Sequence, residues 1–225
     1  MFSEMFYKLI ENNTLYIGIW ETVYMTVFST IVSYIIGLPL GVLLSVTDKK
    51  SICPMPVLNR ILGIFVNIFR SIPFIILMVA VLPVAKFFVG TSLGNRAMMV
   101  TLIIAASPYV ARMVESSIKE VDAGIIEAAQ AMGTPSFKII TKVLIPEAKP
   151  SLIVGSVIST VTILGYSAMA GTIGGGGLGQ IAITFGYQRF KNDIIWVCVV
   201  LTIIIVQVIQ EIGMYIAKKT DKRIK

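Results

Sequence analysis

One glycine-rich segment of this sequence has the spacing of a nucleotide-binding turn. Residues 174–179 read GGGGLG, which fits the pattern G-x-G-x-x-G. A dinucleotide-binding turn must follow a β-strand inside a βαβ unit, and here a long apolar segment precedes it. We therefore interpret the segment as a flexible turn after a membrane helix, because glycine permits backbone conformations that other residues rarely adopt.

Several kinds of chemistry are disfavoured by what the sequence lacks. It contains no histidine, which excludes Ser-His and Cys-His nucleophile pairs and most zinc sites. It has no G-x-x-x-x-G-K-[ST] loop, so we expect any ATP to be bound by another chain. Cys53 and Cys198 form no C-x-x-C pair and are read as small buried hydrophobic residues. We expect no catalytic residues, no metal site and no cofactor in this chain.

Arg70 lies inside a predicted membrane span at residues 61–82. A central arginine costs about 3 kcal/mol on insertion, and each Leu, Ile, Phe or Val returns about 0.3–0.6 kcal/mol, so this segment still inserts. Charge inside a membrane marks a functional site by default, and a bend at the adjacent Ser71-Ile72-Pro73 could open a polar cavity. Alternatively, a span that begins later would let Arg70 extend to the cytoplasmic surface.

The composition predicts that lipid is the solvent for much of the chain. Hydrophobic residues make up 56% of it and charged residues 14%, against about 25% charged in an ordinary soluble domain. Spanning helices need about 20 mostly apolar residues, and five segments qualify: 15–46, 61–82 with a possible extension to 89, 97–114, 151–173 and 194–217. We predict an all-α integral membrane protein with about five transmembrane helices in a single domain, residues 1–225.

Two segments near the N-terminus have alternative interpretations. In residues 1–13, apolar residues recur at helical spacing, which favours a helix in the membrane interface; a frayed terminus is the alternative. The GLPLG sequence at residues 37–41 is a G-x-x-x-G pattern containing a proline. It predicts close helix packing, and a moving hinge is the alternative.

The placement of Lys and Arg predicts the orientation. If residues 115–150 are cytoplasmic, most of the 19 basic residues fall inside, including those at the C-terminal end. The exceptions are Lys8, Lys86, Arg96, Arg189 and Lys191 outside, and Arg70 within a span. We predict that the N-terminus is outside and the C-terminus cytoplasmic, so the net charge of +7 needs no nucleic acid to explain it.

Residues 115–150 are too polar for lipid and carry signals for two short helices. Asp122 is a candidate N-cap and Gly133 a candidate C′ residue. A second helix is predicted to start at Thr134 and Pro135, and we expect Pro146 and Pro150 to break the chain before the fourth span. Small alanines on the first helix would let another protein approach its backbone; an ordinary structured loop is the alternative.

This loop resembles the EAA signature of binding-protein-dependent ABC importer permeases. The family pattern is E-A-A-x3-G-x9-I-x-L-P, and the chain departs from it only by Val143 and Ile145, which are also aliphatic. The positions that match are Glu127, Ala128, Ala129, Gly133 and Pro146. The resemblance implies a cytoplasmic coupling helix between spans 3 and 4 that docks on a separate ATPase subunit, two copies of which bind ATP and Mg²⁺.

Within that family, the chain is similar to methionine-importer permeases. The similar segments are GLPLGVLL at 37–44, RSIPFI at 70–75, GYSAMAG at 165–171, and residues 174–179 through GYQRF at 186–190. The resemblance implies a homodimer in the cell membrane that imports methionine, L and/or D, by alternating access. An external binding protein would select the solute, and 174–179 would belong to the outer mouth. A permease for another small solute, such as a different amino acid, remains the alternative.

The fourth span contains the candidate gate. By resemblance, Met169 lies where methionine permeases have a narrow gate, and its flexible side chain suits an apolar path; ordinary packing is the alternative. Tyr166 and Ser167 could offer hydrogen bonds to a passing ammonium or carboxylate group. A membrane-embedded enzyme or a passive channel are the competing classes of function, and turnover by the chain alone or conductance without ATP would favour them.

Overall fold

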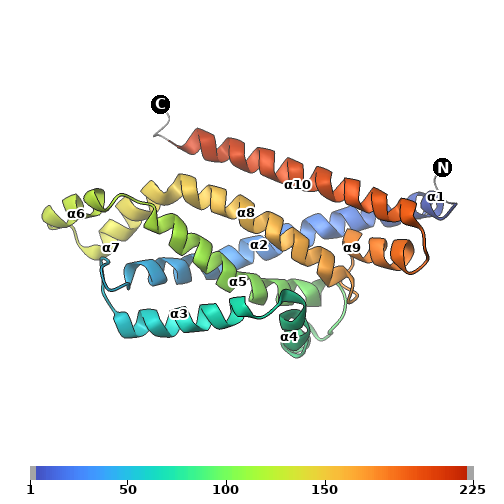
Figure 1. Cartoon of the computed structure of the whole chain (residues 1–225), viewed down its shortest axis with the longest axis horizontal. Helices are drawn as coiled ribbons and strands as arrows, with labels where there is room; N and C mark the ends of the chain where they lie inside the picture. Colours follow the sequence, from blue (N-terminus) through green and yellow to red (C-terminus); the bar gives the residue numbers. More distant parts are fainter. Residues whose placement is uncertain (1–3, 222–225) are drawn as a thin grey trace. The chain divides into compact units, whose positions relative to one another are not determined.

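A computed structural model describes residues 4–221 of the chain, and all regular structure in this range is helical. The shorter elements are α1 (Glu4–Glu11), α3 (Pro56–Ser71), α4 (Phe74–Val89), α6 (Ala123–Ala131), α7 (Ser136–Ile139), η1 (Ile140–Leu144), α9 (Gly177–Ile181) and η2 (Ala182–Tyr187). The long helices are α2 (Thr14–Val46), α5 (Asn95–Lys119), α8 (Ile145–Gly171) and α10 (Asn192–Thr220) (Figure 1). The predicted all-α fold is confirmed.

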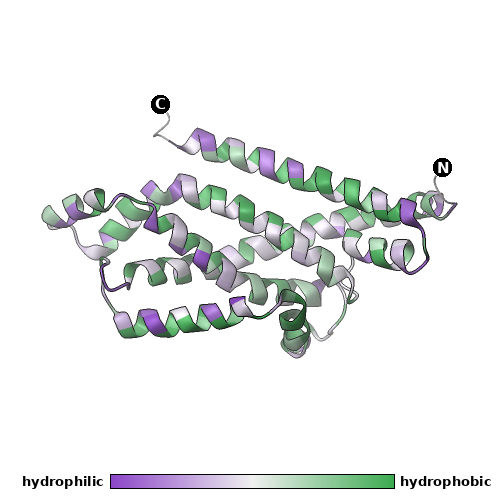
Figure 2. Cartoon of the chain, viewed as in Figure 1, coloured by the Kyte–Doolittle hydropathy of each residue, from purple (hydrophilic) through white to green (hydrophobic). Residues whose placement is uncertain are grey.

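Four helical stretches are long and apolar enough to cross a membrane, or up to five if one bent pair counts as a single span. Three predicted spans, 15–46, 97–114 and 194–217, correspond to α2, α5 and α10. Green, hydrophobic residues cover most of α4 and α10, whereas purple, hydrophilic ones recur along α3 and at the C-terminal end of α10 (Figure 2). The segment predicted at 1–13 and the basic C-terminal end extend beyond the described residues, at 1–3 and 222–225.

The second predicted span is two helices, α3 and α4, which form the bent pair. The break falls at Ile72 and Pro73, where the sequence analysis expected a bend. Pro73 has an extended ψ of 134°, and a proline disfavours helical geometry in the residue before it, here Ile72. Gly90 ends α4 in the left-handed conformation at φ 80°, where its N–H donates to Lys86 O.

The expected chain break before the fourth span is wrong. Residues Ser136–Gly171 form one helical stretch of 36 residues that includes α7, η1 and α8. Pro146 lies in the first turn of α8, directly after the π-helical turn η1, in which Ile145 N–H donates to Ile140 O five residues back. A widened turn of this kind lets a helix continue where a proline removes an N–H donor.

The described chain contains two compact units. Unit 1 comprises Met1–Val32, Ile72–Ala106 and Thr160–Ile209, and unit 2 comprises Ser33–Ser71, Ser107–Ser159 and Gln210–Lys225. Each of the helices α2, α5, α8 and α10 contributes residues to both units.

Unit 1 has two apolar clusters. One joins α1, α9 and α10 through buried residues that include Leu9, Leu178 and Ile194, so part of the apolar face of α1 packs on protein. The other is rich in methionine. Its buried members are Met25, Met78, Met98, Met99, Leu102 and Ala170.

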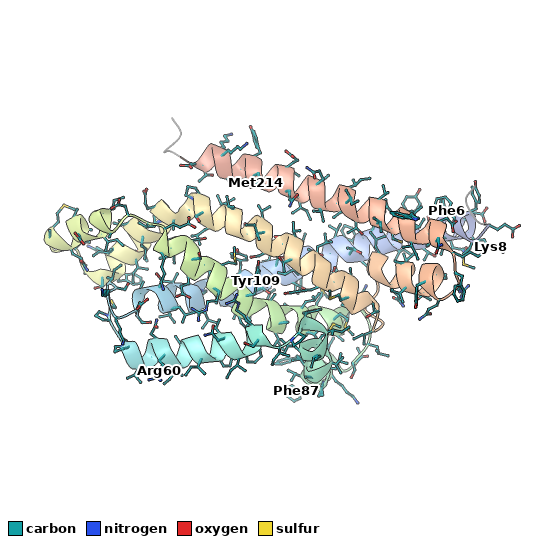
Figure 3. The ribbon with its side chains drawn as sticks, in the orientation of Figure 1. Phe6, Lys8, Arg60, Phe87, Tyr109 and Met214 are labelled. Atoms are coloured by element: carbon teal, nitrogen blue, oxygen red, sulfur yellow. The ribbon has the colours of Figure 1, made fainter. Side chains whose placement is uncertain are left out.

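Unit 2 is built around close packing of α2 on α5. A Cβ on Gly37 would lie 2.7 Å from a side-chain carbon of Val110, and a Cβ on Gly41 would lie 2.4 Å from Ala111 O. Both positions are therefore closed to larger residues, as predicted from the G-x-x-x-G spacing. Exposed side chains occur in both units, as Arg60 of unit 2 and Phe87 of unit 1 illustrate (Figure 3).

Candidate functional site

The loop between α5 and α8 begins with a capped helix, α6. The Asp122 carboxylate accepts a hydrogen bond from Gly124 N at 2.6 Å, which fixes the N-terminus of α6. At the other end, Gly133 has φ 72° and donates its N–H to Gln130 O. These are the cap and the C′ glycine predicted from the sequence, and they hold α6 at a fixed length.

The outer side of this loop is exposed and partly apolar. Glu127, Ala128, Gly133 and Pro146 are exposed, whereas Ala129 is buried. Large apolar side chains also face solvent here: Ile125 is 40% exposed, Met132 78% and Phe137 76%. Such a patch around small residues suits contact with another protein, because alanine lets a partner approach the helix backbone.

The inner side of the loop is anchored in unit 2. Ile126 of α6 and Ile140 of η1 pack on a buried cluster to which α5 contributes Val110, Val114 and Ile118. Leu144, which is 2% exposed, belongs to the same cluster. The buried side of the loop thus shares one apolar cluster with α5 and with the start of α8.

Charged residues tie α5 to the segment after α2. Glu115 binds both Arg112, at 2.5 Å, and Lys119, at 2.9 Å. Lys119 also binds Asp48 at 3.1 Å. The Lys119 ammonium that hydrogen-bonds to the Asp48 carboxylate, helped by the backbone N–H of Lys49, holds the pKa of Asp48 below its ordinary value of 3.8.

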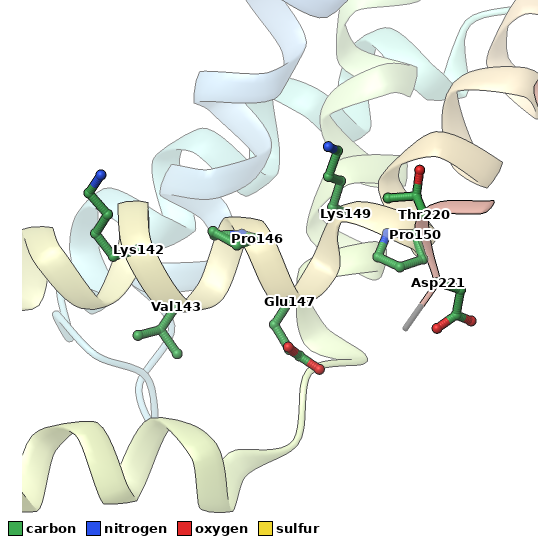
Figure 4. Close-up of a pocket in the computed structure, with 8 residues that line it drawn as sticks. All are labelled: Lys142, Val143, Pro146, Glu147, Lys149, Pro150, Thr220 and Asp221. Carbon is green, nitrogen blue, oxygen red and sulfur yellow. The ribbon is translucent and has the colours of Figure 1, made fainter. Parts of the chain in front are cut away.

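A surface pocket of about 420 Å³ lies where η1 and α8 meet, close to the end of α10. Figure 4 shows its lining. The residues are Lys142, Val143, Pro146, Glu147, Lys149, Pro150, Thr220 and Asp221. Pro146 is the one residue of the predicted coupling set that lines it, and the lining mixes both signs of charge.

The candidate gate residues lie near the end of α8, in unit 1. Met169 is 47% exposed. Tyr166 stacks on Phe74 of α4, with ring centroids 4.1 Å apart. Ser167 is buried, donates to Leu164 O at 2.7 Å and lies 3.4 Å from the Thr26 hydroxyl of α2. Of the three, only Met169 has an exposed side chain, while Tyr166 and Ser167 contact neighbouring helices.

The glycine-rich turn at residues 174–179 packs tightly against the last turn of α8. A Cβ on Gly179 would lie 2.2 Å from Ala168 O, and one on Gly171 would lie 2.4 Å from Gln180 N. Gly177 N–H donates to the Glu21 carboxylate at 2.8 Å, and Leu178 N–H donates to Thr22 Oγ1 at 2.9 Å. Glycine is needed here for close approach, and also for the backbone conformations expected from the sequence, because Gly174, Gly176 and Gly177 have φ of 88°, 78° and 76°.

Arg70 occupies the last turn of α3, immediately before the break. Its side chain is exposed. It belongs to unit 2, like the coupling loop, whereas Met169, Tyr166 and Ser167 belong to unit 1.

Comparison with known proteins assigns the family. Residues 37–225 match the family described as "Binding-protein-dependent transport system inner membrane component". The chain belongs to this family. It is a multi-pass permease component of the inner membrane, and so a transport subunit, which confirms the resemblance seen in the EAA pattern.

Relatives in this family cover nearly the whole chain. The methionine import system permease protein MetP of Bacillus subtilis is 48% identical over 220 residues, which is 98% of this chain and 99% of the relative. A probable D-methionine transport system permease protein, MetI of Vibrio cholerae, is 46% identical over 95% of both chains.

Chains from two solved ABC transporter structures have the same fold. A chain of the MetNI methionine ABC transporter, in an inward-facing conformation, superposes with a TM-score of 0.92 at 43% identity, covering 98% of this chain and 100% of that one. A chain from an amino acid ABC transporter has a TM-score of 0.79 at 16% identity, which shows the shared fold alone.

Two sets of polar contacts were not predicted from the sequence. One is the hydrogen bond from the glycine-rich turn to Glu21, and the other is the set of ion pairs along α5. Glu21 was detectable as an acidic residue in the first part of a long apolar span. The Arg112–Glu115–Lys119 series has the i, i+3 and i+4 spacings of helix ion pairs. Its link to Asp48, 71 residues away, has no local signal.

Proposed function

We propose that this permease imports methionine, L and/or D, by alternating access. The identity of 46–48% to permeases named for methionine or D-methionine transport, over 95% or more of the chain, carries this proposal. The TM-score of 0.92 to a methionine transporter chain supports it further.

The proposed assembly contains two copies of this chain, two ATPase subunits and an external binding protein. Two ATPases would bind ATP and Mg²⁺, because the chain has no phosphate-binding loop of its own. We propose that the whole chain acts as one permease domain, with the N-terminus outside and the C-terminus cytoplasmic. The excess of Lys and Arg on the proposed inner side supports this orientation.

Glu127, Ala128, Ala129, Gly133 and Pro146 are the proposed coupling residues. The exposed side of α6 would dock on the ATPase, and the buried side would transmit its movement through Ile126 to the cluster on α5. Glu127 would contact the ATPase, because its charged side chain is exposed. Gly133 would maintain the left-handed end of α6, because φ 72° is costly for other residues.

Met169, Tyr166, Ser167 and Arg70 are the proposed residues of the path. Met169 would form the gate, since its polarizable side chain is open. Tyr166 and Ser167 would position it through their contacts with Phe74 and Thr26. Arg70 would line the path from the end of α3.

Reconstitution tests the proposal. The permease, with its cognate ATPase and binding protein, is placed in proteoliposomes and assayed for ATP-dependent uptake of a panel of radiolabelled amino acids. We expect saturable uptake of methionine and little of the others. ATP-driven uptake of a different solute in preference to methionine would refute the assignment of substrate.

The coupling role is tested in the same system with Glu127→Lys. We expect uptake to fall at least about tenfold while the complex still inserts, because a reversed charge at the docking surface meets the partner unfavourably. Lys138→Gln, an exposed change on α7, is the matched control. Unchanged uptake with the whole segment 122–146 scrambled would rule out coupling through this loop.

A further inference from the structure

Helix α3 has a polar stripe beside its buried face. Val66 is 1% exposed and packs with Leu62 on Leu44 and Ala111. On the adjacent side, Arg60, Gly63, Asn67 and Arg70 recur at the three- and four-residue spacings that align side chains along one helix face. Exposed apolar residues follow on the remaining side. These are Val57, Ile61, Ile64, Phe65 and Ile68.

The middle of this stripe contacts Arg112 of α5. Arg112 donates from one terminal nitrogen to Asn67 Oδ1 at 2.8 Å. The same nitrogen would lie 3.8 Å from a Cβ on Gly63, an ordinary contact distance, so Arg112 also lies next to Gly63. Asn67 and Arg70 are three residues apart on α3 and are therefore neighbours on its surface. Arg70, Asn67 and Arg112 thus gather polar donors at one place in unit 2; we call these three residues the α3 cationic cluster.

The charges around the cluster do not balance. Arg112 and Lys119 are matched by Glu115 and Asp48 through the ion pairs described above. The Arg70 side chain makes no hydrogen bond or ion pair with any residue in the described range 4–221. An exposed guanidinium without a counter-charge is thereby left three residues from the Asn67 amide on the same helix face.

The position of Arg70 within the bent pair disfavours contact of its side chain with lipid. It lies 14 residues beyond Pro56, or about 21 Å along the helix axis at 1.5 Å per residue. The α3–α4 pair is apolar enough to be counted as a span. Intramembrane arginines face a protein interior or a water-filled cavity rather than lipid, so the polar stripe is the side of α3 that is turned away from lipid.

We propose that the α3 cationic cluster is a subsite that binds the carboxylate of the amino acid during its passage through the permease. Arg70 supplies a planar pair of donors that matches a carboxylate in geometry and charge. Asn67 Nδ2 adds a donor, because its Oδ1 already accepts from Arg112. Arg112 then acts as a positioning residue that orients the Asn67 amide. This inference rests on the proposed function, since it assigns a subsite on the path of that solute.

The subsite gives the permease its own requirement for a carboxylate, separate from the selection made by the binding protein. A solute without a carboxylate would leave Arg70 unneutralised. The apolar part of the solute would not contact the cluster, so the subsite would not distinguish methionine from other amino acids of similar size.

The experiment measures saturable binding of radiolabelled L-methionine to the purified permease–ATPase complex without ATP and without binding protein. Competitors are L-methioninol, which has a hydroxyl in place of the carboxylate, and methylthiobutyrate, which keeps the carboxylate and lacks the amine. We expect methylthiobutyrate to compete and methioninol to compete at least about tenfold less well. Arg70→Gln should weaken binding about tenfold or more, and Arg70→Lys should weaken it less, because the charge remains without the paired donors.

Arg60→Gln is the matched control, since Arg60 is an exposed arginine of the same stripe ten residues away. It should match wild type in basal ATP hydrolysis and bind methionine within about twofold of wild type, and size-exclusion chromatography of every variant verifies assembly. Unchanged binding by Arg70→Gln, equal competition by methioninol, or no saturable binding by the wild-type complex would each overturn the subsite. So would a loss of co-purifying anionic lipid in Arg70→Gln without a loss of methionine binding.

Failure of the subsite and failure of the proposed function remain distinguishable. ATP-driven methionine uptake by wild-type proteoliposomes, together with unchanged binding by Arg70→Gln, would leave the importer assignment intact and remove the subsite. Preferential uptake of a different solute by wild type would remove the importer assignment itself.

Discussion

Glycine residues in this permease differ sharply in what surrounds them, and the differences decide their tolerance to substitution. A Cβ on Gly41 would lie 2.4 Å from a backbone oxygen of α5, which cannot move aside without shifting the helix. A Cβ on Gly165 of α8 would meet nothing within 4 Å. Two helix glycines in the same chain should therefore respond to the same change in opposite ways.

We expect Gly41→Ala to destabilise the permease by about 1–3 kcal/mol through overpacking. Gly165→Ala should be neutral or stabilising by up to about 1 kcal/mol, because alanine is the better helix former. The loss of monodisperse complex on heating, followed by size-exclusion chromatography, measures both. A lower melting temperature for Gly165→Ala than for Gly41→Ala would contradict the described packing of α2 on α5.

Asp48 gives a second prediction at this scale. Its pKa is lowered by Lys119, so its contribution to stability is present above the ordinary value of 3.8 and disappears as the pH falls through the lower folded-state value. We expect Asp48→Asn to lower the melting temperature slightly at pH 6, and this difference from wild type to shrink as the pH falls below 3.8. Because the pair is largely exposed, the effect is small. A difference that grows on acidification would exclude the pairing with Lys119.

At the scale of elements, α2 holds the glycine turn through Glu21 and Thr22. Replacing Glu21 by Ala leaves the Gly177 N–H without its partner, which costs about 1–3 kcal/mol. We expect hydrogen exchange in the peptide covering 174–181 to accelerate about tenfold or more, and Glu21→Gln to have a smaller effect because its amide oxygen still accepts.

The control for this change is Glu11→Gln, since Glu11 is an exposed acid on α1. It should leave exchange in 174–181 unchanged. Equal exchange in wild type and Glu21→Ala would mean that the turn is held by packing alone.

Several helices and helix ends could be predicted from the sequence. Hydropathy located α2, α5 and α10, because lipid imposes a minimum apolar length on each span. Ser-Ile-Pro at residues 71–73 indicated the break between α3 and α4, since a proline restricts the residue before it. The cap at Asp122 and the turn at Gly133 followed from local backbone requirements.

Contacts between distant segments could not be predicted in this way. The continuity of the helix through Pro146 depends on the π-helical turn before it. No residue pattern in the sequence predicts that turn. The hydrogen bond between Arg112 and Asn67 joins residues 45 apart on different helices. Ser167 has a hydroxyl that could line a translocation path. Whether it is instead buried against Thr26 depends on how α8 is rotated.

At the scale of the whole molecule, orientation in the membrane decides which face the ATPase can reach. Cys53 and Cys198 are the only cysteines, so a variant lacking both is a suitable background for single-cysteine labelling. We expect a cysteine at position 130 to react with a membrane-impermeant maleimide only from the cytoplasmic side. A cysteine at position 191 should react only from outside, and the reverse pattern would contradict the proposed topology.

The methionine-rich cluster of unit 1 makes the newly synthesised, unfolded chain sensitive to oxidation. Met25, Met78, Met98 and Met99 are shielded once packed, but each is open to oxidants before the chain has folded. Conversion to the sulfoxide would place a polar group in an interior with no partner for it. Damage sustained during biosynthesis would therefore persist as a permease that cannot mature, unless a sulfoxide reductase repairs the chain first.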